Sequence, residues 1–257
     1  MKNTFFTTLI STLALTGICA TSAQAFTFKT NYTTSDTSEW KSDISLSSVE
    51  IGSKTYSNFS LVKDVNIIQN DLWTGDNTGA ASSDRGDNAS GVQVENPTGS
   101  NLAASLGNLN LSNIIDSEDN GKFTLDLFFG KPVDNFLFFE RGKNSKLKVQ
   151  ALNKTGELTG NSILLDSSGW ENAGYRLDTT EITSGAQVVG SLGVSLLDLG
   201  LTDAKSFGGL RLISESNYGG PDFKVVGLNK AVPEPATVLG LGLVGAALAM
   251  SRRKKAQ

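Results

Sequence analysis

The centre of the chain reads KFTLDLFFGKPVDNFLFFER over residues 122–141, and this stretch decides the fold class. Large apolar residues alternate with polar ones over 123–127 and then run without a break over 136–139, which is a pattern of β-strands rather than of helices. Between them, Gly130-Lys131-Pro132 is a turn signal. We therefore predict two buried strands that pair as a central hairpin.

Shorter segments of the same kind lie on both sides of this stretch. Alternation at 44–47 and 49–51 and apolar residues over 56–68 predict strands in the first half of the chain. Spacings of roughly 8–15 residues, with Gly or Asn between strands, are typical of an all-β protein with one β-sandwich, jelly-roll-like, over residues 26–230. Further strands are expected at 147–152, 162–165, 175–178, 186–189, 210–213 and 223–228.

Residues 69–107 are polar and rich in glycine, and we predict a long loop region there. Clustered carboxylates in this loop offer the oxygen ligands that calcium prefers. A second acidic segment, 116–121, imitates the first half of an EF-hand, but Leu127 stands where the bidentate Glu is required, so that motif is rejected. We expect no metal ligands and no cofactor, and we keep a structural calcium ion as the alternative. The acidic residues of the loop are Asp71, Asp76, Asp84, Asp87 and Glu95.

The composition excludes several kinds of catalysis. The 257 residues include no His and one Cys, Cys19, so a Ser-His-Asp triad, a histidine-ligated zinc and an intramolecular disulfide are ruled out. We expect no catalytic residues and no enzymatic activity. A hydrolase that uses paired carboxylates stays as an alternative, although its candidates are more simply read as turn and strand-face charges. Those candidates are Asp126, Asp134, Glu140, Asp166 and Glu171.

The first 25 residues have the pattern of a secretory signal peptide. Lys2 precedes an apolar stretch, and Ala23 and Ala25 stand at the positions where signal peptidase accepts small residues. Cleavage is expected before Phe26, with the general secretion translocon and signal peptidase as the first partners.

The last 27 residues, 231–257, have three parts in a fixed order. Pro233, Glu234 and Pro235 come first, residues 236–250 carry no charge, and a basic cluster ends the chain. Fifteen residues of helix reach roughly 22 Å, short of a hydrocarbon core of about 30 Å, so the segment crosses a membrane only with mismatch. The cations keep the end of the chain cytoplasmic and place the preceding domain outside. They are Arg252, Arg253, Lys254 and Lys255.

This order of motif, apolar span and basic end resembles the PEP-CTERM sorting signal of bacterial surface proteins. The resemblance implies recognition and cleavage near the motif by an exosortase, after a transient stay in the inner membrane. Segments 83–87, 125–141 and 220–227 resemble exosortase-dependent surface proteins, many of them cyanobacterial. Such proteins are associated with exopolysaccharide, biofilm and extracellular matrix, and the family supplies no catalytic residues to transfer.

Removing both ends leaves residues 26–232 with 17 basic and 25 acidic residues, a net charge of −8. Nucleic acid is therefore not an expected partner. We predict an exported structural or adhesive surface protein. One alternative is a carbohydrate-binding module or hydrolase, the other a protein that stays anchored by its tail. A deep cleft with convergent carboxylates favours the hydrolase, whereas a flat face with exposed aromatic residues favours binding. The candidate aromatics are Trp40, Trp73, Trp170, Tyr32, Tyr56, Tyr175 and Tyr218.

Overall fold

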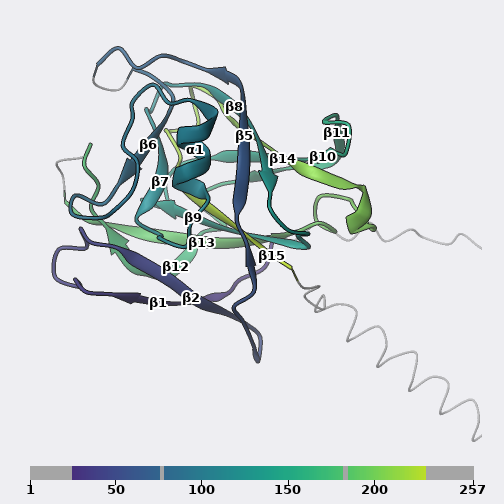
Figure 1. The fold of residues 1–257 in the computed structure, drawn as a ribbon, viewed down its shortest axis with the longest axis horizontal. Helices are drawn as coiled ribbons and strands as arrows, with labels where there is room; N and C mark the ends of the chain where they lie inside the picture. The colour runs from purple at the N-terminus through teal and green to yellow at the C-terminus, as the bar shows by residue number, and fades with distance from the viewer. Residues whose placement is uncertain (1–24, 76–77, 182–184, 230–257) are drawn as a thin grey trace, which may run out of the picture.

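A computed structural model describes residues 25–75, 78–181 and 185–229, and the regular secondary structure of this part is almost entirely β-strand (Figure 1). The all-β prediction is confirmed. The elements in chain order are β1 (Lys29–Thr34), β2 (Ile44–Ile51), β3 (Lys54–Tyr56), β4 (Phe59–Ser60), β5 (Val62–Asn70), β6 (Ala81–Arg85), α1 (Gly99–Leu106), β7 (Asn113–Ser117), β8 (Phe123–Phe129), β9 (Asn135–Arg141), β10 (Leu147–Asn153), β11 (Leu158–Leu165), β12 (Glu171–Leu177), β13 (Gln187–Ser195), η1 (Ala204–Ser206), β14 (Phe207–Ser214) and β15 (Asp222–Leu228).

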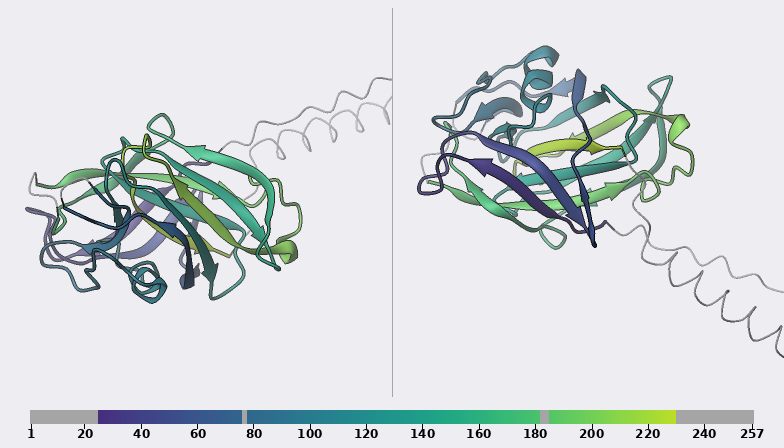
Figure 2. Two further views of the ribbon diagram at one scale, coloured as in Figure 1. Left: turned by 90° about the horizontal axis from the view of Figure 1, so that it is seen from above. Right: turned by 60° about the horizontal axis from the view of Figure 1, so that its bottom comes forward.

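The strands form three antiparallel sheets. The central sheet has the order β12-β13-β9-β15-β7-β6, with β4 paired to β15, and a five-stranded sheet has the order β11-β10-β14-β8-β5. These two sheets pack face to face as a sandwich. The outer sheet, β1-β2-β3, covers the other face of the central sheet (Figures 1 and 2). The middle strands of the central sheet, β9 and β15, are therefore buried on both faces.

Strand β9 shows how the sequence encodes this position. Phe136 and Phe138 point into the core shared with the five-stranded sheet, while Leu137 and Phe139 point into the core under the outer sheet. Successive side chains of a strand point to opposite faces, so a strand covered on both sides reads as an unbroken apolar run.

The predicted hairpin between the two central strands is wrong. Strand β8 pairs with β5 and β14 in the five-stranded sheet, whereas β9 pairs with β13 and β15 in the central sheet. The turn around Gly130 carries the chain from one sheet to the other. Their burial patterns explain the separation. In β8, Leu125 and Leu127 face the core, while Thr124 and Phe128 on the other face are only partly buried, so β8 buries mainly one face. Strand β9 buries both faces.

The region 69–107, predicted to be a loop, contains strand β6 and helix α1. The helix begins with a capping box, in which the Thr98 hydroxyl accepts from the Asn101 N–H and the Asn101 side chain accepts from the Thr98 N–H at 2.9 Å. Leu102 and Leu106 are buried in the core of the sandwich. The helix closes the core beside β5, and its loops bring β6 onto the edge of the central sheet.

Candidate functional site

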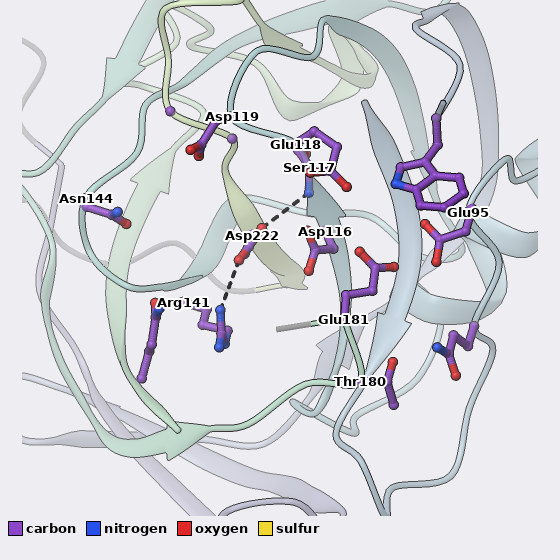
Figure 3. A pocket seen from close by; sticks show the side chains of 15 residues that line it. Glu95, Asp116, Ser117, Glu118, Asp119, Arg141, Asn144, Thr180, Glu181 and Asp222 are labelled. Carbon is purple, nitrogen blue, oxygen red and sulfur yellow. Dashed lines mark hydrogen bonds and ion pairs between the residues drawn. The ribbon is translucent and has the colours of Figure 1, made fainter. Parts of the chain in front are cut away.

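A polar pocket of about 500 Å³ opens at the end of the central sheet where β15 begins (Figure 3). Its walls come from β7, β9, β15, the segment after β12 and the loop before α1. Six of its lining residues carry a carboxyl group, and one, Arg141, carries a permanent positive charge. The pocket therefore gathers far more acidic than basic groups.

Strand pairing places one of these acidic side chains, Asp116, next to a buried one, Asp84. In the β6–β7 ladder Ser82 lies opposite Asp116, and Asp84 lies opposite Ile114. Residues two apart on one strand share a face, so Asp84 and Asp116 are diagonal neighbours on the same face of the sheet. Glu181 reaches this face from the segment after β12, where its Oε1 accepts a hydrogen bond from the Ser82 hydroxyl at 3.1 Å.

Asp84, Asp116 and Glu181 form a compact group, which we call the carboxylate trio. One oxygen from each lies within 4.8 Å of the other two. Asp84 is 0% exposed and Asp116 is 5% exposed. The Asp84 Oδ1 accepts from the Arg85 N–H at 2.7 Å, but its Oδ2 and the Asp116 Oδ2 accept no hydrogen bond from any described residue. Two buried carboxylate oxygens are thus left with unused lone pairs.

Further acidic groups surround the trio. Asp222 lies against Asp116, and its Oδ1 accepts from the Ser117 N–H at 3.2 Å. Its Oδ2 forms an ion pair with Arg141 Nη1 at 3.4 Å. Asp222 is therefore the carboxylate that pairs with the positive charge of Arg141. On the other side, Glu95 faces Glu181.

The acidity of these groups is shifted by their surroundings. Burial, with the charges of Asp222 and Asp84, raises the pKa of Asp116 well above its usual range. Burial and the nearby Asp116 raise the pKa of Glu181 to about 9, and burial raises the pKa of Asp222 to about 7. Burial also raises the pKa of Asp84. Since a raised pKa favours the neutral acid, the pocket holds its full negative charge only at a cost in folding free energy.

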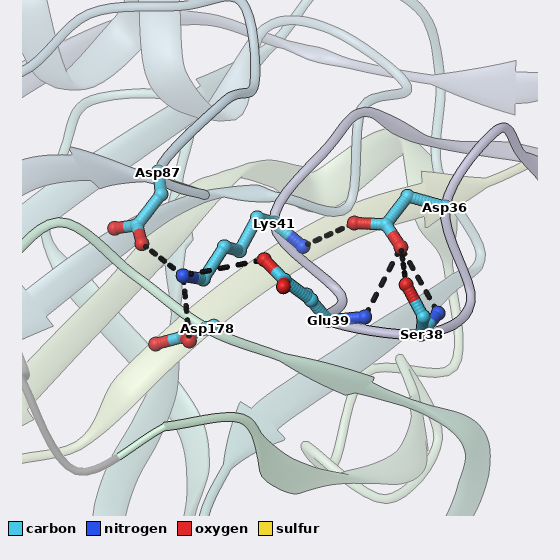
Figure 4. A network of polar contacts seen from close by, with 6 residues as sticks. All are labelled: Asp36, Ser38, Glu39, Lys41, Asp87 and Asp178. Carbon is cyan, nitrogen blue, oxygen red and sulfur yellow. Dashed lines mark hydrogen bonds and ion pairs between the residues drawn. The ribbon is translucent and has the colours of Figure 1, made fainter.

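A second carboxylate cluster lies close by in the chain and is arranged differently. Lys41 Nζ lies 3.2 Å from Asp87, 3.5 Å from Glu39 and 3.9 Å from Asp178, which we call the Lys41 network (Figure 4). Next to it, the N–H groups of Glu39 and Lys41 lower the pKa of Asp36 to about 2. Each carboxylate of the Lys41 network therefore has a cation within reach.

Lys224 is a buried basic residue of the central sheet that lies outside the pocket. Its Nζ donates to the Ser105 carbonyl oxygen at 2.5 Å and to Asn108 Oδ1 at 3.1 Å, at the end of α1. Burial lowers its pKa to about 7. It does not neutralise the carboxylate trio.

The other acidic residues named from the sequence serve local roles or lie outside the described residues. Asp126 forms a two-point ion pair with Arg211 at 2.6 and 2.7 Å, and Asp71 accepts from the Lys122 N–H at 3.0 Å. Asp166 caps the turn at Ser168, and the Glu140 carboxyl accepts from the Ser145 hydroxyl, with a pKa that burial raises to about 7. Asp76 lies outside the described residues.

Most of the aromatic candidates are buried or partly buried. Trp170, Tyr56 and Tyr175 are buried in the core. Tyr32 packs edge-on against Trp40 and Tyr175. Trp73, 40% exposed, is the large aromatic residue that lines the pocket.

The carboxylate trio fits an ion better than it fits hydrolysis by paired carboxylates. The pocket does bring acidic groups together, as the hydrolase alternative expects. Hydrolysis, however, needs two reachable carboxyl groups about 5 to 9 Å apart with room for a sugar or water between them. Here three carboxyl oxygens crowd within 4.8 Å, and Asp84 and Asp116 are buried.

Sequence reasoning named part of this site. Asp84, Glu95 and Asp116 belong to the two segments considered for calcium. In the structure Glu95 and Asp116 line the pocket, and the buried Asp84 lies beside Asp116 in the trio. Glu181 and Asp222 were missed because neither lies in a dense run of acidic residues. The glycine pair Gly219-Gly220 just before Asp222 is a sequence signal for a tight turn at this point. Gly220 has φ +52°, and a Cβ there would lie 2.1 Å from the Ser117 carbonyl oxygen, so the turn packs closely against the end of β7.

Both predicted processing signals lie outside the described residues, apart from Ala25. The predicted mature N-terminus, Phe26, pairs through its backbone with Gly193 of β13, with N–H···O distances of 2.9 and 2.8 Å. Over residues 25–75, 78–181 and 185–229, no helix combines the length and the hydropathy that crossing a membrane requires. The predicted span 236–250 falls beyond this part.

Comparison with known families decides what the tail is. Residues 231–254 match the PEP-CTERM protein-sorting motif. The PEP-CTERM motif implies export to the cell surface through the secretion machinery, with processing by an exosortase. No curated protein and no solved structure matches the chain.

Proposed function

We propose that this PEP-CTERM protein is a non-enzymatic structural or adhesive component of the cell surface or extracellular matrix, linked to exopolysaccharide and biofilm. The observation that carries the proposal is the match of residues 231–254 to the sorting motif. The absence of His from the sequence and the burial of the carboxylate trio support a role without catalysis.

Processing is the first step to test. Intact-mass measurement on protein recovered from the native host should show a chain that starts at Phe26 and lacks residues 252–255. Glu234→Ala should keep the basic end and stay in the membrane fraction, because the motif that the exosortase recognises is broken. Glu157→Ala, in an exposed turn, is the matched control and should be processed normally. Retention of Arg252 to Lys255 in the wild-type protein would support a permanent anchor instead.

Carbohydrate contact is the second candidate, and Trp73 favours it. Its indole is 40% exposed beside the polar groups of the pocket, an arrangement in which an aromatic ring packs on a sugar face. Co-sedimentation with exopolysaccharide from the host should be weakened by Trp73→Ala and unchanged by Leu197→Ala, another exposed apolar side chain. Release of reducing ends during the same incubation would instead show a hydrolase.

A further inference from the structure

We propose that Asp84, Asp116 and Glu181 bind a calcium ion between β6, β7 and the segment after β12. The proposal goes beyond export and matrix function, and it concerns the folded domain rather than the sorting tail. It stands on three observations: the spacing of the oxygen atoms, their unused lone pairs, and the charge around them.

The spacing fits one coordination sphere. Calcium binds oxygen ligands at about 2.3–2.6 Å, so two ligands on opposite sides of the ion lie up to about 5 Å apart. The three carboxyl oxygens lie within 4.8 Å of one another. One ion can therefore contact all three without a change of backbone.

The lone pairs give the second observation. Asp84 and Asp116 are 0% and 5% exposed, and the Oδ2 atom of each has no hydrogen-bond partner among the described residues. Asp84 is held in place from its other oxygen by the Arg85 N–H and the Thr180 hydroxyl. Buried polar atoms in folded proteins are almost always satisfied. A bound cation satisfies both oxygens at once.

The charge around the trio gives the third observation. The other carboxyl groups that face it are Glu95 beside Glu181 and Asp222 beside Asp116, and Glu140 lies beyond Asp222. Arg141 is the cation of the pocket, and its Nη1 pairs with Asp222. The described residues thus surround the trio with more acidic than basic groups, and a divalent cation would stabilise the deprotonated form of the trio.

The ligand set selects the kind of ion. The sequence has no His, and its one Cys lies in the predicted signal peptide, so the nitrogen and sulfur ligands that zinc and copper prefer are missing from the folded domain. Magnesium requires a near-ideal octahedron and gives up its water reluctantly. Calcium accepts irregular oxygen cages, and its remaining positions would face the pocket.

The test uses the full chain in mild detergent, freed of metal with EGTA. Calcium at 10 mM should raise the thermal midpoint by about 3–10 °C, and magnesium should need at least about 10-fold higher concentration for the same shift. Terbium, which replaces calcium and is excited through nearby tryptophan, should luminesce on binding because Trp73 lines the same pocket. The absence of any calcium shift and of terbium luminescence would overturn the proposal, and an equal magnesium response would overturn the assignment to calcium.

Variants connect the response to the trio. Asp116→Asn and Glu181→Gln should each weaken calcium binding at least about 10-fold while the metal-free midpoint stays the same or rises, since a group whose ionisation is unfavourable in the folded state is removed. Asp119→Asn is the matched control, because this exposed carboxylate lines the same pocket outside the trio, and it should bind calcium like the wild type. Equal calcium affinity in all three variants would place the ion elsewhere and reject the proposed site.

Discussion

The carboxylate trio and the Lys41 network share two segments of the chain. Asp84 and Asp87 lie three residues apart, as do Asp178 and Glu181, and each segment gives one carboxylate to each cluster. In the Lys41 network, three carboxylates surround the lysine ammonium. In the trio, three carboxylates surround a space that no basic side chain of the described residues occupies.

Burial explains why the difference matters. The side chain of Lys41 keeps contact with solvent, so water and salt screen its cluster, whereas Asp84 and Asp116 are shielded from both. A buried group of like charges has a large cost unless protons or a cation neutralise it. The comparison therefore predicts that the trio responds strongly to pH and calcium and that the Lys41 network responds mainly to salt.

The largest effect should come from removing the pocket's arginine. Arg141→Met leaves Asp222 buried without its counter-charge, and we expect a loss of about 3–5 kcal/mol in the free energy of unfolding, measured by urea denaturation in EGTA. Arg176→Met removes an exposed arginine of β12 and should change stability by less than about 1 kcal/mol. Similar losses in the two variants would show that the pocket does not depend on Arg141 for charge balance.

An intermediate effect should follow from pH. A carboxyl group whose folded pKa is raised binds more protons in the folded state, so the metal-free protein should gain stability as pH falls from 7 to 5. With Glu181 at about 9 and Asp222 at about 7, and discounting Glu181 for partial exposure, we expect these two groups to contribute about 1–3 kcal/mol. Glu140, with a pKa of about 7, adds to the gain in the same direction. The pKa of Lys224 is lowered to about 7 and that of Asp36 to about 2, and these two groups change the stability mainly outside the range from pH 5 to pH 7.

The matched variants for this measurement are Glu181→Gln and Asp119→Asn. Urea midpoints at pH 5, 6 and 7 should show a flatter slope for Glu181→Gln and the wild-type slope for Asp119→Asn. Saturating calcium should also reduce the gain, since the ion requires the deprotonated acids. A metal-free protein that loses stability toward pH 5 would contradict the charge balance described for the pocket.

The smallest effect should come from the Lys41 network. Lys41→Met should lower the thermal midpoint by less than Arg141→Met does, because solvent screens the three carboxylates that remain. The loss should shrink between 20 and 500 mM NaCl, and Lys54→Met, at an exposed turn, should show no such salt dependence. A loss that does not change with salt would mean that Lys41 acts by packing rather than by charge.

Much of the fold was predictable because most strands carry their own signal. Strands β2, β8, β9, β10 and β15 read correctly as strands, since alternation or an apolar run is a local property. Their partners depend on which faces other sheets cover, so β8 and β9 were assigned to one hairpin. Strand β6 was not predicted, because its sequence is polar and its burial comes from the elements packed around it. Helix α1 was not predicted either, because it is short and its main local signal is the capping pair Thr98 and Asn101.

The site was predictable only in pieces. Density of acidic residues pointed to Asp84, Glu95 and Asp116, but the trio depends on the register of β6 against β7 and on Glu181, almost a hundred residues from Asp84. Long-range pairing of this kind leaves no periodic pattern in one sequence. The sorting motif was predictable because its three parts are contiguous and in order.

Strand β15 links the acidic pocket to the segment that leads to the sorting motif. Its first residue, Asp222, lines the acidic pocket, and its last, Leu228, stands just before the chain leaves the described domain toward the sorting motif. Seven residues of strand put about 20 Å between these points. The acidic pocket and the point where the chain continues toward the sorting motif therefore lie at opposite ends of β15.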